Sequence, residues 1–286
     1  MKLSQTTAVQ TYRYVVADVF TDTPLTGNQL AVFTDARGLD DATMQALARE
    51  MSFSETVFVL PPEGDGHVRI RIFTPAVELP FAGHPVLGSA FVLGQPLQLV
   101  EIRLETGSGV VPVRLEREGP RITFGWMSQP VPRWRSYERA DELLSVLGVE
   151  SELPVDWYDL GPTHVFVALR AADEVAALRP DFTALEAFDV GVNCFAPLDG
   201  RWKTRMFAPG SGVAEDPATG SAAGPLAIHL LRHGRIASGD EIEIEQGAEL
   251  LRPSRLYARA EGTAEAIERV EVGGSAVVVA RGEFGL

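Results

Sequence analysis

Two segments of this 286-residue chain repeat one pattern, and the repeat restricts the fold more than any other feature of the sequence. Residues 71–75 (RIFTP) are followed by residues 82–84 (AGH) and an apolar run, and residues 205–209 (RMFAP) are followed by residues 219–221 (TGS) and a second apolar run. Each copy has the order expected of a strand, a loop, a glycine-containing turn and a helix. A duplicated unit predicts two pseudo-symmetric halves, with the two helix starts facing each other across a cleft.

The distribution of apolar residues predicts strands and helices in both halves of the chain. Runs rich in β-branched and aromatic residues predict strands at 12–20, 29–33, 53–60, 68–73, 165–169, 192–196, 201–207 and 276–280, with a hairpin at 100–104 and 110–115. Apolar stripes and capping residues predict helices at 41–51, 86–93, 140–147 and 222–233, with Gly94 and Gly234 ending the second and fourth.

A proline-punctuated stretch, residues 129–134 (QPVPRW), has weak periodicity and is the expected link between two domains. We therefore expect an N-terminal lobe at residues 1–128 and a C-terminal lobe at residues 129–273. The last strand lies within residues 274–286 and is a candidate to rejoin the N-terminal lobe. The active site is expected in the cleft between the lobes.

Composition excludes several classes of protein. The net charge of -14 argues against a nucleic-acid binder, because neutralising phosphates requires clustered Lys and Arg. A single cysteine, Cys194, excludes an intramolecular disulfide framework, and its apolar neighbours predict a buried core thiol rather than a nucleophile. The sequence contains neither a signal-peptide pattern nor an apolar run of membrane-spanning length, so we expect a soluble, cytoplasmic protein without a membrane partner.

Motifs for metals and cofactors are weak. His229 and His233 have the i,i+4 spacing that can hold zinc, but no HExxH pattern is formed, and we expect them on a helix surface near its C-terminus. No Walker sequence, dinucleotide fingerprint or G-x-S-x-G elbow occurs in the sequence. We therefore expect no cofactor and no metal.

The two predicted helix starts are candidate anion sites. A helix N-terminus carries unpaired N–H groups and a partial positive charge, which suit a carboxylate, and glycine there allows a ligand close to the backbone. Residues 215–224 (EDPATGSAAG) also supply hydroxyl groups and two carboxylates. The alternative is that these glycines and small residues only allow a tightly packed helix start.

Three titratable residues are candidate catalytic groups. Glu55 lies among apolar and β-branched residues, where loss of water would raise its pKa toward that of a general acid/base; alternatively it lies on the solvent face of a half-buried strand. His84 is either a structural histidine or a proton partner in the cleft, and Asp216 is either a loop cap or the acidic partner from the second half. Their convergence in one cleft would be typical of an active site.

Four runs together resemble the phenazine-biosynthesis PhzF family, in the expected order and over nearly the whole chain. They are residues 18–33 (DVFTDTPLTGNQLAVF), 44–59 (MQALAREMSFSETVFV), 71–88 (RIFTPAVELPFAGHPVLG) and 205–230 (RMFAPGSGVAEDPATGSAAGPLAIHL). The resemblance implies an α+β fold like that of diaminopimelate epimerase, with two pseudo-symmetric lobes, each a curved or barrel-like sheet around a central helix. It also implies a homodimer and no cofactor.

The resemblance further implies an activity and a set of site residues. Phenazine-type members isomerise trans-2,3-dihydro-3-hydroxyanthranilate, a small cyclic amino acid, to an unstable ketone. Matching motif to motif, the resemblance assigns the proton shuttle to Glu55. The remaining assignments are catalytic roles for His84 and Asp216, and substrate binding by Asn28, Ser54, Gly83, Gly220 and Ser221.

Two departures from related patterns bear on the activity. Cysteine-dependent epimerases of this fold place thiols just before the cleft glycines, where this chain has Ala82 and Thr219, so a two-thiol racemase is excluded. Pro217 resembles the wider family, which leaves open an isomerase or epimerase acting on a different small acid. The other alternative is a non-catalytic small-molecule binding protein of the same fold.

Overall fold

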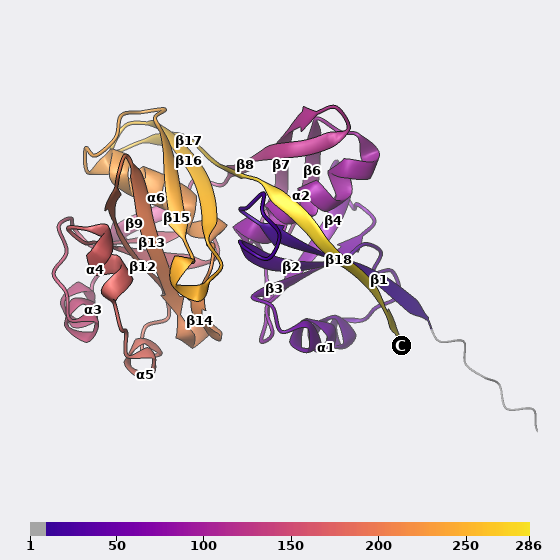
Figure 1. The fold of residues 1–286 in the computed structure, drawn as a ribbon, viewed down its shortest axis with the longest axis horizontal. Coiled ribbons are helices and arrows are strands. Elements are labelled where there is room, and N and C mark those ends of the chain that lie inside the picture. The colour runs from indigo at the N-terminus through magenta and orange to yellow at the C-terminus, as the bar shows by residue number, and fades with distance from the viewer. Residues whose placement is uncertain (1–9) are drawn as a thin grey trace, which may run out of the picture.

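The computed structural model describes residues 10–286, which form two lobes lying side by side (Figure 1). Mixed strands surround one long helix in each lobe, and short helices lie at the periphery. The α+β fold of two similar lobes, each with a sheet around a central helix, is therefore confirmed. No helix within residues 10–286 has the length and apolar character needed to cross a lipid bilayer.

The first lobe wraps its strands around helix α2 (Gly83–Leu97). Strands β2 and β3 are parallel, as are β4 and β6, and the remaining neighbours in this lobe are antiparallel. Its other elements are β1 (Thr11–Val19), β2 (Asn28–Phe33), α1 (Asp41–Met51), β3 (Glu55–Leu60), β4 (Val68–Phe73), β5 (Glu78–Leu79), β6 (Glu101–Thr106), β7 (Gly109–Glu118) and β8 (Arg121–Gln129).

The second lobe repeats this plan around helix α6 (Gly220–Arg232), with β11 parallel to β12 and β13 parallel to β15. Its strands are β9 (Arg133–Ser136), β10 (Asp156–Asp159), β11 (Thr163–Ala168), β12 (Gly191–Leu198), β13 (Arg201–Ala208), β14 (Val213–Asp216), β15 (Glu241–Gln246), β16 (Ser254–Gly262) and β17 (Ile267–Gly274). Its peripheral helices are α3 (Ala140–Leu147), α4 (Ala172–Ala177) and α5 (Phe182–Leu185), with 3₁₀ turns at Pro209–Ser211 and Ala248–Leu250.

Strands carry the chain from one lobe to the other. Strand β8 continues to Gln129 and pairs with β17, so of residues 129–134 only 130–132 lie outside strands. After β17 the chain returns, and β18 (Ala276–Gly285) pairs with β1 along its whole length, as the yellow strand in Figure 1 shows. The lobes are thus joined by paired strands, which resist bending more than a loop of the same length.

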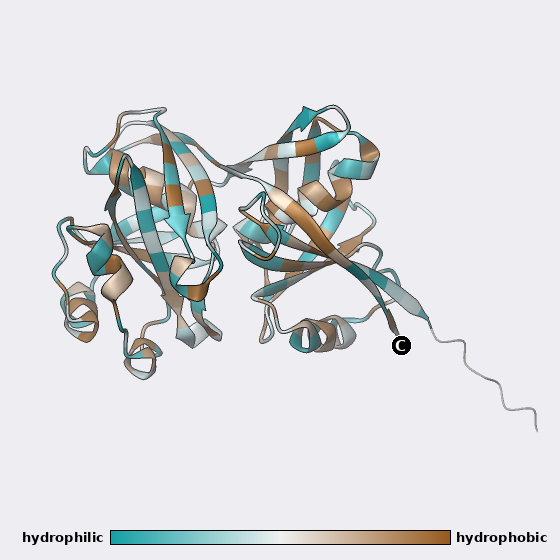
Figure 2. Ribbon diagram, viewed as in Figure 1, coloured by the Kyte–Doolittle hydropathy of each residue, from teal (hydrophilic) through white to brown (hydrophobic). Residues whose placement is uncertain are grey.

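Alternating side chains direct apolar residues inward. In β15 (EIEIEQ), Ile242 and Ile244 are buried while the three glutamates that alternate with them are partly or fully exposed, and Figure 2 shows such banding along the strands. The largest apolar cluster contains residues of both α2 and α6, so it is continuous across the lobes. Cys194 is fully buried in a second cluster, which confirms its predicted place in the core.

One predicted helix boundary is wrong. Helix α2 begins at Gly83 and continues through Gly94 to Leu97, where Gln98 adopts the left-handed conformation that ends it. A Cβ on Gly94 would lie 2.5 Å from a methyl of Leu115, so this glycine serves close packing against β7. Sequence alone does not separate a packing glycine from a terminating one. Gly234, by contrast, follows α6 with a φ of 67° and fits the expected C-terminal position.

The first turns of α2 and α6 meet end to end, as the repeat predicts. A Cβ on Gly83 would lie 2.4 Å from the carbonyl carbon of Gly220 and 2.6 Å from the amide nitrogen of Ser221. Both neighbouring atoms belong to the backbone and cannot rotate away. Glycine at position 83 is therefore required for the two lobes to approach this closely.

Substituting Gly83→Ala should destabilise the folded protein by about 1–3 kcal/mol or more, because the two helix starts must separate to admit the methyl group. Gly210→Ala is the matched control, since an added Cβ there meets its nearest atoms at 3.4 Å, an ordinary contact distance. Urea unfolding followed by circular dichroism measures both variants. Equal free energies of unfolding for the two would contradict the close contact.

Candidate active site

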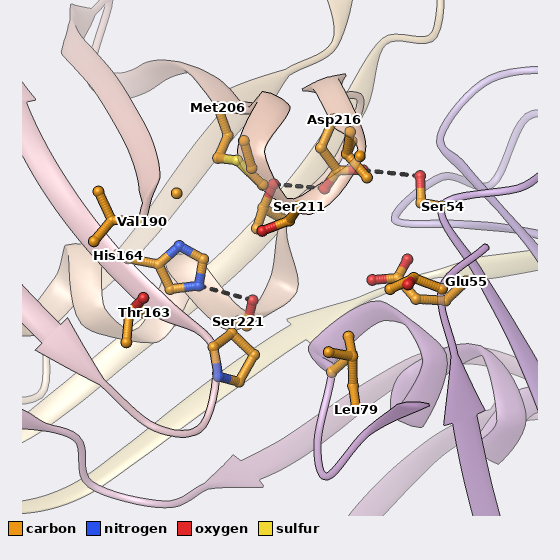
Figure 3. A pocket seen from close by; sticks show the side chains of 18 of the residues that line it. Ser54, Glu55, Leu79, Thr163, His164, Val190, Met206, Ser211, Asp216 and Ser221 are labelled. Carbon is orange, nitrogen blue, oxygen red and sulfur yellow. Dashed lines mark hydrogen bonds between the residues drawn. The ribbon is translucent and has the colours of Figure 1, made fainter. Parts of the chain in front are cut away.

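A cavity of about 760 Å³ lies between the lobes, at the meeting point of the two central helices. Both lobes contribute side chains to it, and Figure 3 shows those of one lobe facing those of the other. Of the eight residues predicted for the site, the following seven line the cavity: Ser54, Glu55, Gly83, His84, Asp216, Gly220 and Ser221. The eighth, Asn28, is buried directly behind it, where it contacts two of the others.

Glu55 is the first residue of β3, and its side chain points into the cavity (Figure 3). The side chain is 15% exposed, and Oε2 has no hydrogen-bond partner among residues 10–286. Nδ1 of His84 lies 3.4 Å from this oxygen. Loss of water, and secondly the charge of Asp216, raise the pKa of Glu55 well above its usual value. The alternative placement of Glu55 on a solvent-facing strand surface is wrong.

Asp216 ends strand β14 of the second lobe but is bound largely by the first. Its Oδ1 accepts hydrogen bonds from Asn28 Nδ2 at 2.8 Å and from Ser54 Oγ at 3.2 Å, and its Oδ2 accepts one from Thr219 Oγ1 at 2.6 Å. Burial raises the pKa of Asp216 to about 6, although these three hydrogen bonds favour the charged form and oppose the shift. Asp216 therefore titrates close to neutrality and contacts both lobes.

His84 is buried in the first turn of α2. Burial lowers its pKa to about 3, against the opposing effect of a hydrogen bond with the Gln29 backbone, so the ring is neutral at physiological pH. Its Nδ1 lies 3.3 Å from Asn28 Nδ2, and its Nε2 has no partner among the described residues. A neutral imidazole beside Glu55 can donate one hydrogen bond and accept another, and its lowered pKa keeps it uncharged while it does so.

The two helix starts bring unpaired backbone donors to the same place. Neither Ala82 nor Thr219, the N-cap residues of α2 and α6, caps its helix with a side chain, since the Thr219 hydroxyl donates to Asp216 instead. Two positive helix ends also repel each other unless an anion lies between them. The first turns of both helices line the cavity, so this end of it favours a carboxylate.

Strand register shows that the two lobes contribute different groups at equivalent positions. Phe73 of the first repeat pairs with Thr56, and Phe207 of the second pairs with Val192. The residue before Thr56 is Glu55, and the residue before Val192 is Gly191.

The same register relates the other carboxylate to an apolar residue. Leu79 pairs with the residue before Phe73 of the first repeat, and Asp216 pairs with the residue before Phe207 of the second. Leu79 and Asp216 therefore occupy equivalent positions in the two lobes. Glu55 and Asp216 therefore occupy non-equivalent positions, and only the first lobe has a carboxylate at the Glu55 position.

The sequence analysis missed His164, which lines the cavity from the second lobe with its Nε2 3.0 Å from Ser221 Oγ (Figure 3). Its position directly before the predicted strand at 165–169 was the available signal. Apolar residues of the cavity wall were also missed, and they include Leu79, Val190 and Met206.

His229 and His233 lie outside the cavity, near Asp156. The expectation of a surface position is wrong for His229, which is fully buried and stacks on Phe166. Asp156 Oδ2 accepts hydrogen bonds from Arg232 at 2.7 Å and pairs with His233 Nε2 at 2.9 Å. The guanidinium of Arg232 already balances the carboxylate, so this cluster is an ion-pair network rather than an arrangement that favours a cation.

The fold and the site define a two-lobed α+β protein with an interlobe cavity in which two largely buried carboxylates, Glu55 and Asp216, lie. The chain matches the family described as phenazine biosynthesis-like protein (PhzC-PhzF) over residues 17–282, and it belongs to that family. It is 52% identical over 273 residues to a trans-2,3-dihydro-3-hydroxyanthranilate isomerase of Pseudomonas aeruginosa, covering 95% of this chain and 98% of the relative.

Solved structures show the same fold. A PhzF-family phenazine biosynthesis protein from Bacillus anthracis is similar with a TM-score of 0.85 and 24% identity, covering 97% of this chain and 100% of the other. A hydroxyproline epimerase from Agrobacterium vitis has a TM-score of 0.64 and 13% identity, covering 96% and 93% of the two chains. The expected likeness to the epimerase fold is therefore confirmed.

Asp216→Asn should change how folding stability depends on pH. The pKa of Asp216 rises from 3.8 to about 6 on folding, so protonation of this carboxyl favours the folded state. Its contribution is fully present below about pH 4 and is lost as the pH rises through about 6. The free energy of unfolding of the wild type, relative to Asp216→Asn, should therefore fall between about pH 4 and about pH 7, as measured by urea unfolding.

The pKa of His84 falls from 6.5 to about 3 on folding, so stability is also lost as the pH falls below 6.5. This second effect is common to both proteins and cancels in their difference. A difference that is constant, or that rises with pH, would contradict the raised pKa of Asp216.

Proposed function

We propose that this chain isomerises trans-2,3-dihydro-3-hydroxyanthranilate to its ketone tautomer, the step named for its relative from Pseudomonas aeruginosa. The observation that carries the proposal is the largely buried carboxylate of Glu55, whose Oε2 has no hydrogen-bond partner among the described residues, beside Asp216 and His84. A carboxylate without a hydrogen-bond partner is costly to bury, and it is a stronger base than one in water. A base of this kind suits proton transfer from carbon.

In the proposed reaction, the ionised Glu55 takes the proton from C3 of the ring. The electrons of the broken C–H bond move through the conjugated ring, and the proton returns from Glu55 to another ring carbon on the same face. The C3 hydroxyl, now part of an enol, loses its proton while the adjacent carbon of the enol double bond gains one, which gives the ketone. The base is regenerated, no electron leaves the substrate, and no oxidant or reductant is needed.

The surrounding groups support this transfer by position and charge. The substrate carboxylate lies at the paired helix starts, where Gly83, Gly220 and Ser221 provide donors. Asp216 and His84 hold the amino and hydroxyl groups in the protonation state that the reaction requires. The single carboxylate at the Glu55 position, with Gly191 at the equivalent position of the second lobe, favours one base rather than two.

The proposal extends to the working state of the protein. It acts without a cofactor, because one carboxylate suffices to move the proton, and as a cytoplasmic homodimer, as the family resemblance implies. The site then lies between the lobes at residues 1–128 and 129–273. Size-exclusion chromatography with light scattering distinguishes twice the chain mass of 31.0 kDa from a monomer.

Glu55→Gln should lower turnover by about 10²- to 10⁴-fold while leaving the fold intact, because the amide is similar in size but is not a base. Ring protons followed by NMR in D₂O measure loss of the dihydro-hydroxyanthranilate and incorporation of deuterium at the receiving carbon. Glu150→Gln is the matched control, since the Glu150 side chain is 88% exposed and lies outside the cavity. Turnover by Glu55→Gln at the control rate would exclude Glu55 as the base.

Thiol reagents should leave this activity unchanged. Burial raises the pKa of Cys194 to about 12, and its side chain is inaccessible, so the thiolate hardly forms at neutral pH. Iodoacetamide treatment of the native protein, followed by the NMR assay and mass spectrometry, tests this expectation. Rapid inactivation with a modified Cys194 would support a thiol mechanism instead.

A further inference from the structure

His164 lies in the cavity wall of the second lobe, across from Glu55 (Figure 3). It belongs to β11, its side chain is buried, and its Nε2 is 3.0 Å from the hydroxyl oxygen of Ser221. Ser221 itself lies in the first turn of α6, among the unpaired backbone donors of the two helix starts. Whether Nε2 of His164 carries a hydrogen therefore determines whether the Ser221 hydroxyl can donate a hydrogen bond to a ligand in the cavity.

Asn193 determines where that hydrogen lies. Its Nδ2 donates to the backbone oxygens of Gly191 at 3.0 Å and Val165 at 3.2 Å, and this pair of acceptors fixes the orientation of the amide. The same nitrogen is 3.4 Å from Nδ1 of His164, and an amide nitrogen has no lone pair that could accept a hydrogen from the ring. A hydrogen on Nδ1 would therefore have no acceptor there, which favours an unprotonated Nδ1 and a ring hydrogen on Nε2.

A hydrogen on Nε2 makes Ser221 a donor to the cavity. Nε2–H donates to Ser221 Oγ, which fills one acceptor position of the hydroxyl and leaves its own hydrogen free. Burial lowers the pKa of His164 to about 4, so the ring stays neutral in the physiological range and this arrangement does not change with pH there. The free hydroxyl hydrogen adds to the donors that favour an anionic group.

The internal repeat explains why His164 fits here. Gly191 occupies the position equivalent to Glu55, and a Cβ on Gly191 would lie 2.8 Å from Nδ1 of His164. The imidazole thus fills space that a side chain at position 191 would need. In the second lobe a histidine supporting a donor takes the place where the first lobe has its carboxylate.

We propose that His164 is a positioning residue that fixes the Ser221 hydroxyl as a hydrogen-bond donor to the carboxylate of the substrate. The proposal rests on the proposed function only in taking a small cyclic amino acid as the ligand. It assigns His164 no contact with the reacting carbons, so its effect falls on ligand binding more than on the chemical step.

Calorimetric binding of anthranilate, an aromatic amino acid with the same carboxylate, tests the proposal through a double-mutant cycle. Ser221→Ala should weaken binding by about 10- to 100-fold, the usual effect of losing a hydrogen bond to a charged group. His164→Phe should weaken binding by about 3- to 10-fold in the wild-type background and have no further effect in Ser221→Ala. Aniline, which lacks the carboxylate, should respond to neither change.

Two further variants separate positioning from a structural role. His164→Gln can place an amide N–H near the position of Nε2 and should restore binding to within about twofold of wild type. His233→Gln changes a histidine outside the cavity and should leave binding unchanged, with thermal unfolding recorded for every variant. Nitrogen NMR of the labelled wild type should show His164 with its hydrogen on Nε2.

Three results would overturn the proposal. The first is that His164→Phe lowers the affinity for anthranilate equally with and without the Ser221 hydroxyl. The second is a wild-type His164 with its hydrogen on Nδ1, and the third is a wild type that does not bind anthranilate. Failure of the proposed function gives a different result. The double-mutant cycle and the NMR spectrum would then agree with the His164 proposal, but the protein would not turn over the dihydro-hydroxyanthranilate.

Discussion

The contact between Gly83 and Gly220 is the constraint on which the rest of this structure depends. It brings the N-termini of two buried helices together, which is unfavourable for their dipoles unless negative charge lies nearby. Because neither helix start has a side-chain cap, the unpaired N–H groups remain available to a ligand. The same contact brings the two lobes together and creates a site whose helix starts favour an anion.

Around that anion end, the protein keeps two carboxylates in different surroundings. Asp216 is stabilised by three hydrogen bonds, whereas Oε2 of Glu55 has none among the described residues. Burial and mutual repulsion therefore raise the pKa of Glu55, and the apolar core that is continuous through α2 and α6 offsets the cost to stability. In the proposed function this difference gives each carboxylate its own role: Glu55 acts as the base, and Asp216 is a charge that both lobes hold in place.

The sequence predicts the parts of this arrangement that local patterns encode. The R-x-F-x-P repeat predicts that the two helix starts face each other. The motif matches predict that Glu55, His84 and Asp216 belong to one site, and all three line the cavity. Long-range packing is not encoded locally, so the sequence predicts a helix end at Gly94 and a surface position for His229, and both predictions are wrong. His164 was missed because its significance depends on Gly191 and Asn193, which approach it only through the pairing of β11 with β12.

The central claim is that Glu55 is a buried base with a raised pKa, and ¹³C NMR of its side-chain carboxyl tests this most directly. In protein labelled at glutamate, the Glu55 resonance is assigned by its absence from Glu55→Gln and followed against pH. We expect a midpoint well above the ordinary 4.5, and a lower midpoint in Asp216→Asn because a neighbouring negative charge is removed. A midpoint near 4.5 that is insensitive to Asp216 would contradict it.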